Sequence, residues 1–480
     1  MSSTIVGRRQ EIKELEEALT TDRPELIALY GRRRVGKTFL VRQTYGERIV
    51  FEVAGLLNGN KKEQLQNFAF TLRDAFPDHS FSSPFPDWLT AFHELGRALD
   101  QYTPPGKSVL FFDELPWLAS PKSGFLMAFG NFWNTYAEKR PLVVVICGSA
   151  ASWMIKRVVQ HRGGLHNRIT RLLALAPFTL GETHAFCRSR GLSFSSYQLL
   201  QIYMTLGGVP AYLEQLRPGQ SAVQNIQRVC FSRNGFLRNE FSRLFASLFK
   251  DYERHVKIVQ HLAARRAGLT REELRRSLKA DSGGSLTRIL EELFESGFIG
   301  IYAAFDKKRK AQLYRLTDPY TLFHLTFIER LPKGDTTNFT ELSQLPGWAA
   351  WSGYAFENVW LSHLNTVRSA LGITGVSSRF GTFTARGTAD APGVQIDLLI
   401  DRRDHVISIC EAKFSSEVLT VTKKLMQELG RKKTALRAHT GTKKQLSVVL
   451  LTTYGIAQLI PELDHIDEVL TIEKLMVASK

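Results

Sequence analysis

The sequence contains few cysteines and no apolar run long enough to cross a membrane. The stretch "PLVVVICGSAASWMI" is short and is interrupted by Gly, Ser and Ala. The segment "MSSTIVGRRQEIKELEEAL" has no signal-peptide core. The four cysteines lie far apart and form neither a CxxC pair nor a disulfide framework: Cys147, Cys187, Cys230 and Cys410. These absences predict a cytoplasmic protein with no membrane partner.

Acidic residues are scarce relative to basic ones. The chain has 63 lysines and arginines against 46 aspartates and glutamates, a formal net charge of +17. Such an excess favours polyanionic partners, and nucleic acid first among them. Because basic proteins of other kinds also exist, the charge indicates a class of partner without identifying it.

The length and the pattern of apolar residues predict several domains. For 480 residues with 44% hydrophobic content, about two to four domains are expected. No internal repeat or low-complexity tract is present. Residues 1–177 alternate apolar strands with helices, residues 178–250 are mostly helical, and residues 251–330 form a helical set followed by a hairpin. Residues 331–347 form a linker rich in Pro, Gly and Thr, and residues 348–480 mix strands and helices. Continuous apolar strands separated by helices indicate a parallel sheet covered on both faces, and hence an α/β fold.

The stretch "LIALYGRRRVGKTFLV" matches the P-loop pattern G-x-x-x-x-G-K-[ST] after an apolar strand. Gly31 and Gly36 would let the backbone turn so that several N–H groups point into one concavity, which holds phosphate. Lys37 would place a positive charge on the β- and γ-phosphates of ATP, and Thr38 would offer its hydroxyl to Mg²⁺. A chance match in a basic chain is the alternative, and the flanking strand and helix argue against it.

A second acidic motif ends the apolar strand in "SVLFFDELPW". Asp113 would hold Mg²⁺ through water, and Glu114 would orient the water that attacks the γ-phosphate. The alternative is an ordinary acidic turn at the end of a strand. Ser149, at the end of the next strand in "VVVICGSAASW", would sense the γ-phosphate or cap a helix.

The segment "HRGGLHNRITRLLALAPF" supplies three arginines, Arg162, Arg168 and Arg171. One interpretation is an arginine finger that acts on the ATP of the same chain or of a neighbouring copy in a homo-oligomer. The other interpretation is a solvated basic loop.

Six motifs in order resemble the archaeal-type ATPases, a branch of the AAA+/STAND-like P-loop ATPases: "IVGRRQEIKELEEAL", "LYGRRRVGKT", "LFFDELPW", "CGSAASW", "LALAPFTLGE" and "GGVPAYL". The resemblance covers roughly the first half of the chain. It implies ATP binding and hydrolysis by a parallel-sheet P-loop core with a helical lid. It also implies a winged helix and a C-terminal α/β domain similar to restriction endonucleases.

Residues 251–330 have the order of helices and strands of a winged helix, but the charge of the second helix does not suit DNA recognition. "TREELRRSL" and "SGGSLTRILEELFESGF" read as two helices, followed by a hairpin in "IGIYAAFDKKRKAQLYRL". The second helix carries Glu291, Glu292 and Glu295, which would face phosphates badly, so base-specific recognition is not expected. The hairpin tip, Lys307 to Lys310, is the better phosphate contact.

The C-terminal region places three charged residues on two strands that otherwise read as core. "GVQIDLLI" and "HVISICEAKF" are separated by a polar turn and predict a hairpin in which Asp397 lies opposite about residue 410, next to Glu411. Glu411 and Lys413 are two residues apart and so project from one face. Such charges are costly unless a metal or a ligand compensates them.

This arrangement suits metal-dependent hydrolysis of phosphodiesters. Asp397 and Glu411 would bind Mg²⁺ or Mn²⁺, Lys413 would orient or activate the attacking water, and Glu357 would add a ligand from a helix. The order of motifs resembles the PD-(D/E)xK nucleases, except that Gln395 stands where relatives often have a second acid, which favours one metal over two. Two functions remain: an ATP-regulated nuclease acting on DNA, or an ATP-driven switch or scaffold that binds nucleic acid or a partner protein without cutting.

Overall fold

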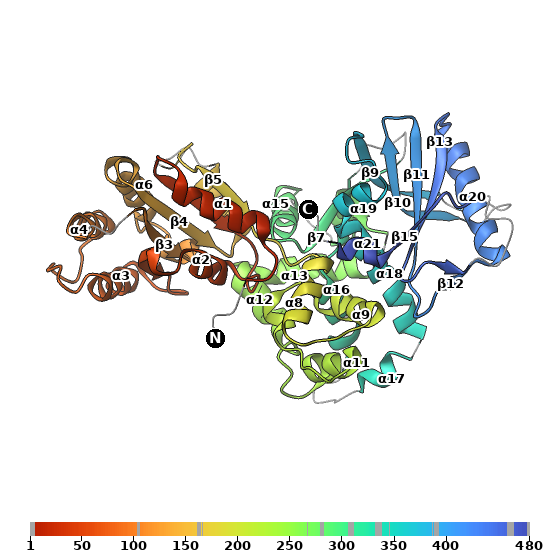
Figure 1. Cartoon of the computed structure of the whole chain (residues 1–480), viewed down its shortest axis with the longest axis horizontal. Helices are drawn as coiled ribbons and strands as arrows, with labels where there is room; N and C mark the ends of the chain where they lie inside the picture. Colours follow the sequence, from red (N-terminus) through yellow and green to blue (C-terminus); the bar gives the residue numbers. More distant parts are fainter. Residues whose placement is uncertain are drawn as a thin grey trace. The chain divides into compact units, whose positions relative to one another are not determined.

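The structure, a computed structural model, describes most of the chain. It forms two compact units, Met1–Ala176 and Pro177–Lys480 (Figure 1). The described residues are 5–102, 106–160, 165, 167–265, 267–278, 283–305, 312–331, 338–344, 346–385, 387, 393–457 and 465–477. Within these residues no helix is both long enough and apolar enough to cross a membrane.

The first unit is built on a parallel sheet of five strands in the order β2-β3-β4-β1-β5. The parallel core predicted from the alternation of apolar strands and helices is confirmed. Strands β3 and β4 are buried along their whole length, as a sheet covered on both faces requires. The strands are β1 (Glu25–Tyr30), β2 (Ile49–Ala54), β3 (Ser108–Asp113), β4 (Leu142–Gly148) and β5 (Arg171–Ala174).

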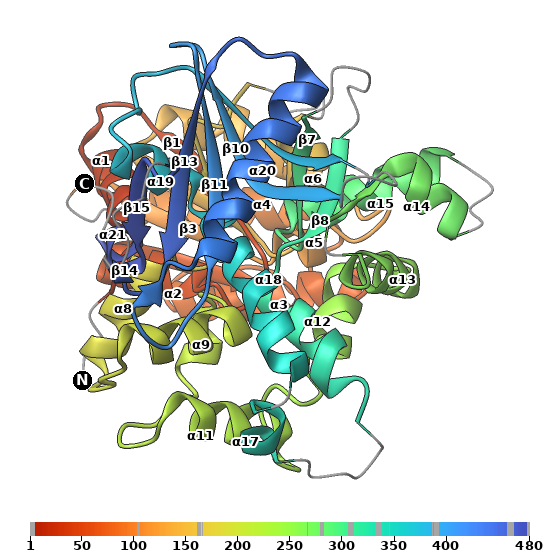
Figure 2. The same ribbon diagram turned by 90° about the vertical axis from the view of Figure 1, so that its right-hand side faces the viewer.

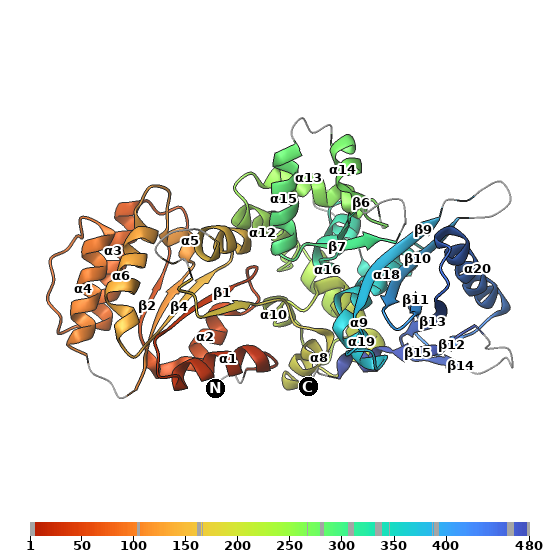
Figure 3. The ribbon, with the colours of Figure 1, turned by 90° about the horizontal axis from the view of Figure 1, so that it is seen from above.

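Alternate side chains of the strands pack into two separate cores. Leu26 and Ala28 of β1 face one core, while Ile27 and Leu29 face the other. Helices α1 (Arg9–Thr20) and α2 (Lys37–Tyr45) cover the second face, and α3 (Lys61–Ala75), α4 (Trp88–Asp100) and α6 (Phe125–Thr135) cover the first (Figure 3). Shorter helical turns join these elements: η1 (Gly46–Arg48), α5 (Leu115–Leu118), η2 (Ala137–Lys139), α7 (Ala151–Met154) and η3 (Ile155–Val159).

The second unit begins with helices that share one continuous apolar core with the elements that follow. Its first helices are α8 (Leu180–Ser189), α9 (Ser196–Leu206), α10 (Pro210–Leu213), α11 (Ala222–Ile226), η4 (Gln227–Phe231) and α12 (Glu240–Leu248). Next come α13 (Tyr252–Ala263), β6 (Leu269–Thr270), α14 (Arg271–Ser277), α15 (Gly283–Glu295), β7 (Ile299–Ala304) and β8 (Gln312–Leu316). This order of helices followed by a hairpin is the one a winged helix needs. The hairpin tip with Lys307 to Lys310 lies outside the described residues.

The hairpin belongs to the same sheet as the C-terminal strands. β7 pairs in parallel with β9, so that one mixed sheet has the order β15-β13-β11-β10-β9-β7-β8-β6. Its remaining strands are β9 (Ser378–Ala385), β10 (Val394–Arg402), β11 (Val406–Lys413), β13 (Gln445–Thr452) and β15 (Glu468–Thr471). The sequence gives no local signal for the pairing of β7 with β9, because the two strands are far apart along the chain.

Helices cover both faces of this sheet. The long helix α20 (Lys423–Thr440) lies across β10, β11 and β13 on one face (Figure 2). On the other face α18 (Pro346–Ser362) contributes Phe356 and Trp360 to the large core. The unit also contains α16 (Pro319–Phe323), η5 (His324–Ile328), α17 (Phe339–Leu342), α19 (Leu364–Ala370), α21 (Ile472–Met476) and the short pair β12 (Leu419–Thr420) and β14 (Ile456–Ala457).

Part of the segment predicted as a linker, residues 331–347, is packed. Residues 332–337 and 345 lie outside the described part of the chain. The ring of Phe339 in α17 is fully buried, and its centroid lies 5.2 Å from that of Phe231 and 5.3 Å from that of Trp348. The aromatic residue therefore anchors this end of the segment to the core.

A close backbone approach in the second unit makes a glycine obligatory. The N–H of Phe178 donates to the carbonyl oxygen of Gly208 at 2.6 Å, and a Cβ on Gly208 would lie 1.9 Å from the carbonyl oxygen of Phe178. We expect Gly208→Ala to lower the free energy of unfolding by about 3 kcal/mol, because the backbone must move to relieve the clash. Urea denaturation of the full chain would measure this loss.

Gly353→Ala is the matched control for that substitution. A Cβ on Gly353, in helix α18, would meet nothing within 4 Å. Alanine is favoured over glycine in a helix by about 0.5–1 kcal/mol, so this variant should be at least as stable as the parent. Equal stability of the two variants would contradict the close approach.

Candidate functional site

The P-loop connects β1 to α2 and is held close to the end of β5. Gly31 has a φ of 155°, and a Cβ there would lie 2.2 Å from the carbonyl oxygen of Leu175. Gly36 has a φ of 91°, a backbone conformation that favours glycine, and α2 begins at the next residue. The two glycines thus occupy the positions where the loop cannot tolerate a side chain.

Lys37 is buried and bridges the P-loop to the end of β4. Its ammonium group donates to the carbonyl oxygens of Gly31 at 2.8 Å and Arg32 at 3.0 Å, and to Ser149 Oγ at 2.9 Å. These three bonds use all the donors of the ammonium group. The phosphate of a bound nucleotide would therefore replace internal partners of Lys37 that are already well placed.

Thr38 and Asp113 come together where α2 starts and β3 ends. Thr38 Oγ1 donates to Asp113 Oδ2 at 2.6 Å. The strand order brings the carboxyl ends of β1 and β3 to the same edge of the sheet, with β4 between them. A hydroxyl and a carboxylate are hard oxygen donors of the kind Mg²⁺ prefers, so this pair fits a nucleotide-bound Mg²⁺.

Glu114 has an unusual backbone and contacts a second predicted residue. Its φ of 47° and ψ of 50° are rare for a residue other than glycine, and such conformations cluster at functional sites. Its carboxylate accepts from Ser149 Oγ at 2.5 Å and from Ser149 N at 3.2 Å. Ser149 therefore links Lys37 to Glu114. It does not cap α7, whose N-cap residue is Ala150.

Two of the three arginines predicted as finger candidates, Arg168 and Arg171, lie away from this site in their own chain. Arg171 opens β5 opposite Ile27, near the amino end of β1, and donates to Glu14 Oε2 at 2.7 Å. Arg168 precedes the same strand and pairs with Glu138 at 3.2 Å. Because the P-loop follows the carboxyl end of β1, neither arginine reaches the ATP site of the same chain. Arg162 lies outside the described residues.

A second cluster of charged residues forms on the hairpin of β10 and β11. In its antiparallel register Leu398 pairs with Cys410. The neighbouring positions, Asp397 and Glu411, therefore face each other across the two strands, within one residue of the predicted register. The pairing of β10 with β9 shifts by one residue between Ile396 and Leu399, and such a bulge re-aims the side chains at this point.

Glu411 is buried and is held by two lysines. Lys413 Nζ lies 2.8 Å from Glu411 Oε1, and Lys432 Nζ lies 2.5 Å from Glu411 Oε2. Lys432 comes from α20 and also pairs with Glu428 at 3.3 Å. Sequence analysis missed Lys432. Its signal is a lysine in the buried stripe of an amphipathic helix, between Leu429 and Leu436.

Glu357 approaches the cluster from α18, where a buried arginine holds it. Arg315 of β8 donates to Glu357 Oε2 at 2.7 Å and lies over the ring of Tyr354, 4.4 Å from its centroid. Sequence analysis did not identify Arg315, because its partner lies 42 positions further along the chain. This ion pair ties the hairpin of β7 and β8 to the helix that carries Glu357.

Two carboxyl groups near the hairpin, those of Asp397 and Glu357, have raised pKa values. Burial, with the nearby charges of Glu357 and Glu411, raises the pKa of Asp397 to about 7. Burial raises the pKa of Glu357 as well, against the opposing effect of Arg315. Burial lowers the pKa of Lys413, but the Glu411 carboxylate outweighs it, so that the net pKa is raised and the ammonium form is favoured.

The cluster supplies two carboxylates on adjacent strands rather than a complete metal cage. Among the described residues, no three His, Cys, Asp or Glu side chains are grouped to hold a metal ion. Mg²⁺ is commonly held by one or two carboxylates together with water and substrate phosphates. Asp397 and Glu411 have the donor chemistry for that role, with Gln395 donating to Asp397 Oδ1 at 3.0 Å.

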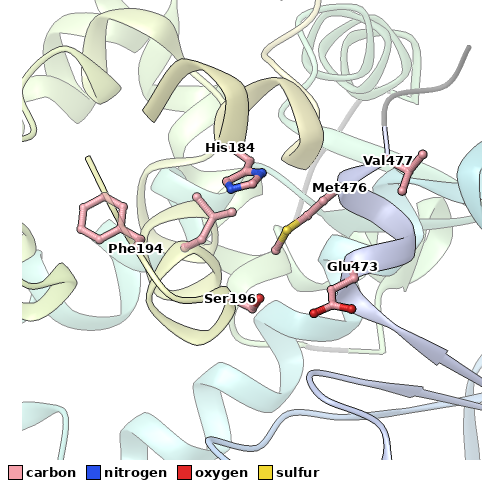
Figure 4. A pocket seen from close by; sticks show the side chains of 7 residues that line it. His184, Phe194, Ser196, Glu473, Met476 and Val477 are labelled. Atoms are coloured by element: carbon pink, nitrogen blue, oxygen red, sulfur yellow. The ribbon is translucent and has the colours of Figure 1, made fainter. Parts of the chain in front are cut away.

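A hollow elsewhere in the second unit has no such chemistry. It measures about 360 Å³ and lies where α21 meets α8 and α9 (Figure 4). Its walls combine apolar side chains with a histidine, a serine and a glutamate: His184, Phe194, Ser196, Leu199, Glu473, Met476 and Val477. None of the residues singled out from the sequence lines it.

Comparison with known proteins identifies the first unit. Residues 5–216 match the family described as an ATPase domain predominantly from Archaea. This part of the chain is an archaeal-type ATPase domain, as its motifs predicted. The match extends beyond the parallel sheet into the first helices of the second unit.

Two relatives and two solved structures are similar to the chain. Protein MJECL04 of Methanocaldococcus jannaschii is 23% identical over 434 residues, which cover 89% of this chain and 91% of the relative. ATP-binding protein MJ0423 of the same organism is 47% identical over 38 residues, 8% of this chain and 64% of the relative. The Walker-type ATPase PABY2304 of Pyrococcus abyssi has a TM-score of 0.48 at 20% identity, covering 67% of this chain and 96% of that one. The ORC2 protein of Aeropyrum pernix has a TM-score of 0.39 at 14% identity, covering 66% and 92%.

Proposed function

We propose that the ATPase works together with a metal-dependent phosphodiesterase in the C-terminal part of the chain, with DNA as the substrate. One observation carries this proposal. Two carboxylates, Asp397 and Glu411, meet on adjacent strands, and a lysine two residues after Glu411 lies on the same face. Charged groups at the ends of core strands are costly, and a cation with a phosphate ligand would relieve that cost.

In the ATPase half, the residues around Ser149 would exchange partners when ATP binds. The γ-phosphate would take the Lys37 ammonium and the Ser149 hydroxyl, which now bond to each other. Release of Ser149 would free the Glu114 carboxylate to orient the attacking water. Thr38 and Asp113 would hold Mg²⁺, which offsets negative charge on the β- and γ-phosphates when bound.

In the phosphodiesterase half, the residues divide into metal ligands and charge donors. Asp397 and Glu411 would hold Mg²⁺ or Mn²⁺, which when bound offsets negative charge on the reacting phosphate. Lys413 is held as an ammonium by Glu411, so we infer that it donates to the phosphate or positions the water rather than removing a proton. Glu357 would complete the site through water, because its carboxylate already accepts from Arg315.

The alternative function is an ATP-driven switch or scaffold whose C-terminal part binds nucleic acid or a partner protein without cleavage. A specific observation favours it. Both oxygens of Glu411 already accept from lysines, Lys413 and Lys432, so the cluster is neutralised in part without a metal. Metal binding would then have to displace at least one of these two partners.

A cleavage assay with the full chain distinguishes the two functions. Plasmid, linear duplex and single-stranded DNA, and an RNA of the same sequence, are incubated with Mg²⁺ or Mn²⁺, with and without ATP. We expect cleavage of DNA that requires the divalent cation and stops with a chelator. Folded protein that hydrolyses ATP, binds no Mn²⁺ in calorimetry and leaves every substrate intact would establish the switch instead.

The arginine finger is a proposal for an oligomer only. Arg168 is about half exposed, and its pair with Glu138 lies at the surface, where such ion pairs are weak and exchange readily. It would act on the ATP of a neighbouring copy. A dependence of the ATPase rate per chain on protein concentration, lost in Arg168→Ala, would support this role.

A further inference from the structure

The exposed side of helix α20 is strongly basic. The helix, "KKLMQELGRKKTALRAHT", contains six lysines and arginines and a single acid, Glu428. Glu428 turns toward the interior cations, 3.3 Å from Lys432 and 3.9 Å from Lys413. The solvent-facing charges are therefore positive. They comprise the exposed Lys423, Lys424, Arg431 and Arg437 and the partly exposed Lys433.

A groove runs along this side of the helix. It has a volume of about 630 Å³ and is lined by Gly430, Lys433, Thr434, Arg437, Ala438 and His465. The His465 ring lies beside Gly430, 3.7 Å from where a Cβ there would be, an ordinary contact distance. The floor is thus made of small residues, and the walls carry donors: an ammonium, a guanidinium, a hydroxyl and an imidazole.

The groove has a net positive charge, because Lys433 and Arg437 carry two charges against the one on Asp467. Lys433 faces Asp467 at 3.9 Å, near the limit of an ion pair. The Asp467 carboxylate also accepts from the N–H of Val448 at 2.6 Å, a bond that holds it at the edge of the sheet. The guanidinium of Arg437 is exposed to solvent and offers the two-pronged geometry that suits a phosphate.

The groove and the carboxylate cluster lie on adjoining sides of one helix. Lys432, which bonds to Glu411 in the interior, directly precedes Lys433 in the groove. Successive residues of a helix differ by about 100° in direction and about 1.5 Å in height. The groove and the cluster thus share helix α20, which reaches the cluster through Lys432.

We propose that this groove on α20 binds the phosphodiester backbone of a nucleic acid and leads it to the Asp397–Glu411 cluster. The inference rests on the proposed function and adds a binding surface to it. An acidic polypeptide would present charge of the same sign, and the test below distinguishes it from a nucleic acid. The charge of the whole chain, +17, favours the same partner.

The test compares two double variants of the full chain. Lys433→Ala/Arg437→Ala removes two positive charges from the groove, and Lys61→Ala/Lys62→Ala removes two exposed charges from α3 of the ATPase. Binding to a fluorescent duplex of mixed sequence is measured by anisotropy at several salt concentrations, with a chelator present so that no cleavage occurs. Each lost phosphate contact should reduce the slope of log K against log salt by about 0.9.

We expect the groove variant to bind about tenfold or more weakly, with a slope smaller by about 2, while the α3 variant binds like the parent. An unchanged slope for the groove variant, or an equal loss in the α3 variant, would overturn the inference. Displacement of the duplex by polyglutamate at equal charge concentration would overturn it as well, in favour of an acidic polypeptide. Melting temperature and ATP turnover confirm that both variants are folded.

The outcome is independent of whether the cluster cuts DNA. Weaker binding in the groove variant together with no cleavage by the parent would support the groove and contradict the nuclease. Normal binding by the groove variant together with metal-dependent cleavage by the parent would support the nuclease and contradict the groove.

Discussion

Glu114→Gln should reduce ATP hydrolysis by about two to three orders of magnitude and leave ATP binding close to that of the parent. Removal of a group that orients and polarises the attacking water typically costs this much. Glutamine has the same shape and can still accept from the Ser149 hydroxyl, which contacts Glu114 Oε1 at 2.5 Å. The phosphate-binding residues Lys37 and Thr38 are untouched, so a stable ATP-bound form should accumulate. Single-turnover hydrolysis and a fluorescent ATP analogue measure the two quantities.

Lys37→Ala provides the opposite pattern from the same site. Its ammonium group is the buried cation of the P-loop, with three internal partners within 3.0 Å. Its loss should weaken ATP binding at least tenfold, because the phosphates lose a charge-assisted hydrogen bond. Suppose that Lys37→Ala abolishes ATP hydrolysis but Glu114→Gln hydrolyses ATP at the rate of the parent. This result would show that Glu114 does not act on the water.

If the proposed phosphodiesterase is active, Lys413→Ala should abolish cleavage of DNA, a loss of at least about a hundredfold, and leave the ATPase rate near its original value. Lys413 and Glu411 lie on the same face of strand β11. No described contact connects Lys413 to the P-loop. Asp397→Ala should lose cleavage as well, since it removes one of two carboxylates. Both activities are measured on the same purified protein, with melting temperature as the test of folding.

The control for Lys413→Ala is an exposed lysine of the same unit. Lys257 lies on the solvent side of α13, and Lys257→Ala removes the same charge without touching the cluster. This variant should cut DNA like the parent. A folded Lys413→Ala protein that also cuts like the parent would eliminate the nuclease and leave the ATP-driven switch.

The features that the sequence predicts well depend on residues close together in the chain. The P-loop between Gly31 and Thr38 is one local turn, and the β10–β11 hairpin has a short connection, so its register follows from counting residues. The parallel order of the first sheet follows from alternating apolar strands and helices. In each case the residues that determine the feature follow one another closely along the chain.

The missing features depend on residues brought together from distant segments. Lys432 reaches Glu411 from 21 positions away, and Arg315 reaches Glu357 from 42 positions away. Neither pair leaves a local pattern. Burial explains both: a charged side chain inside a core needs a partner, but the sequence does not say which. The parallel pairing of β7 with β9 escapes prediction for the same reason.

The continuity of the mixed sheet has a consequence for the fragments that the proposed cleavage would produce. Because β7 and β9 are bonded neighbours, strands β7 and β8 and the carboxylate cluster belong to one hydrogen-bonded sheet. If a nucleic acid bound to the hairpin, the strands between the hairpin and the cluster would fix the distance from the bound segment to the cleaved bond. Fragment ends mapped to single nucleotides should then fall at a narrow, constant offset from the bound region. Ends scattered evenly along the substrate would show that the hairpin does not hold it.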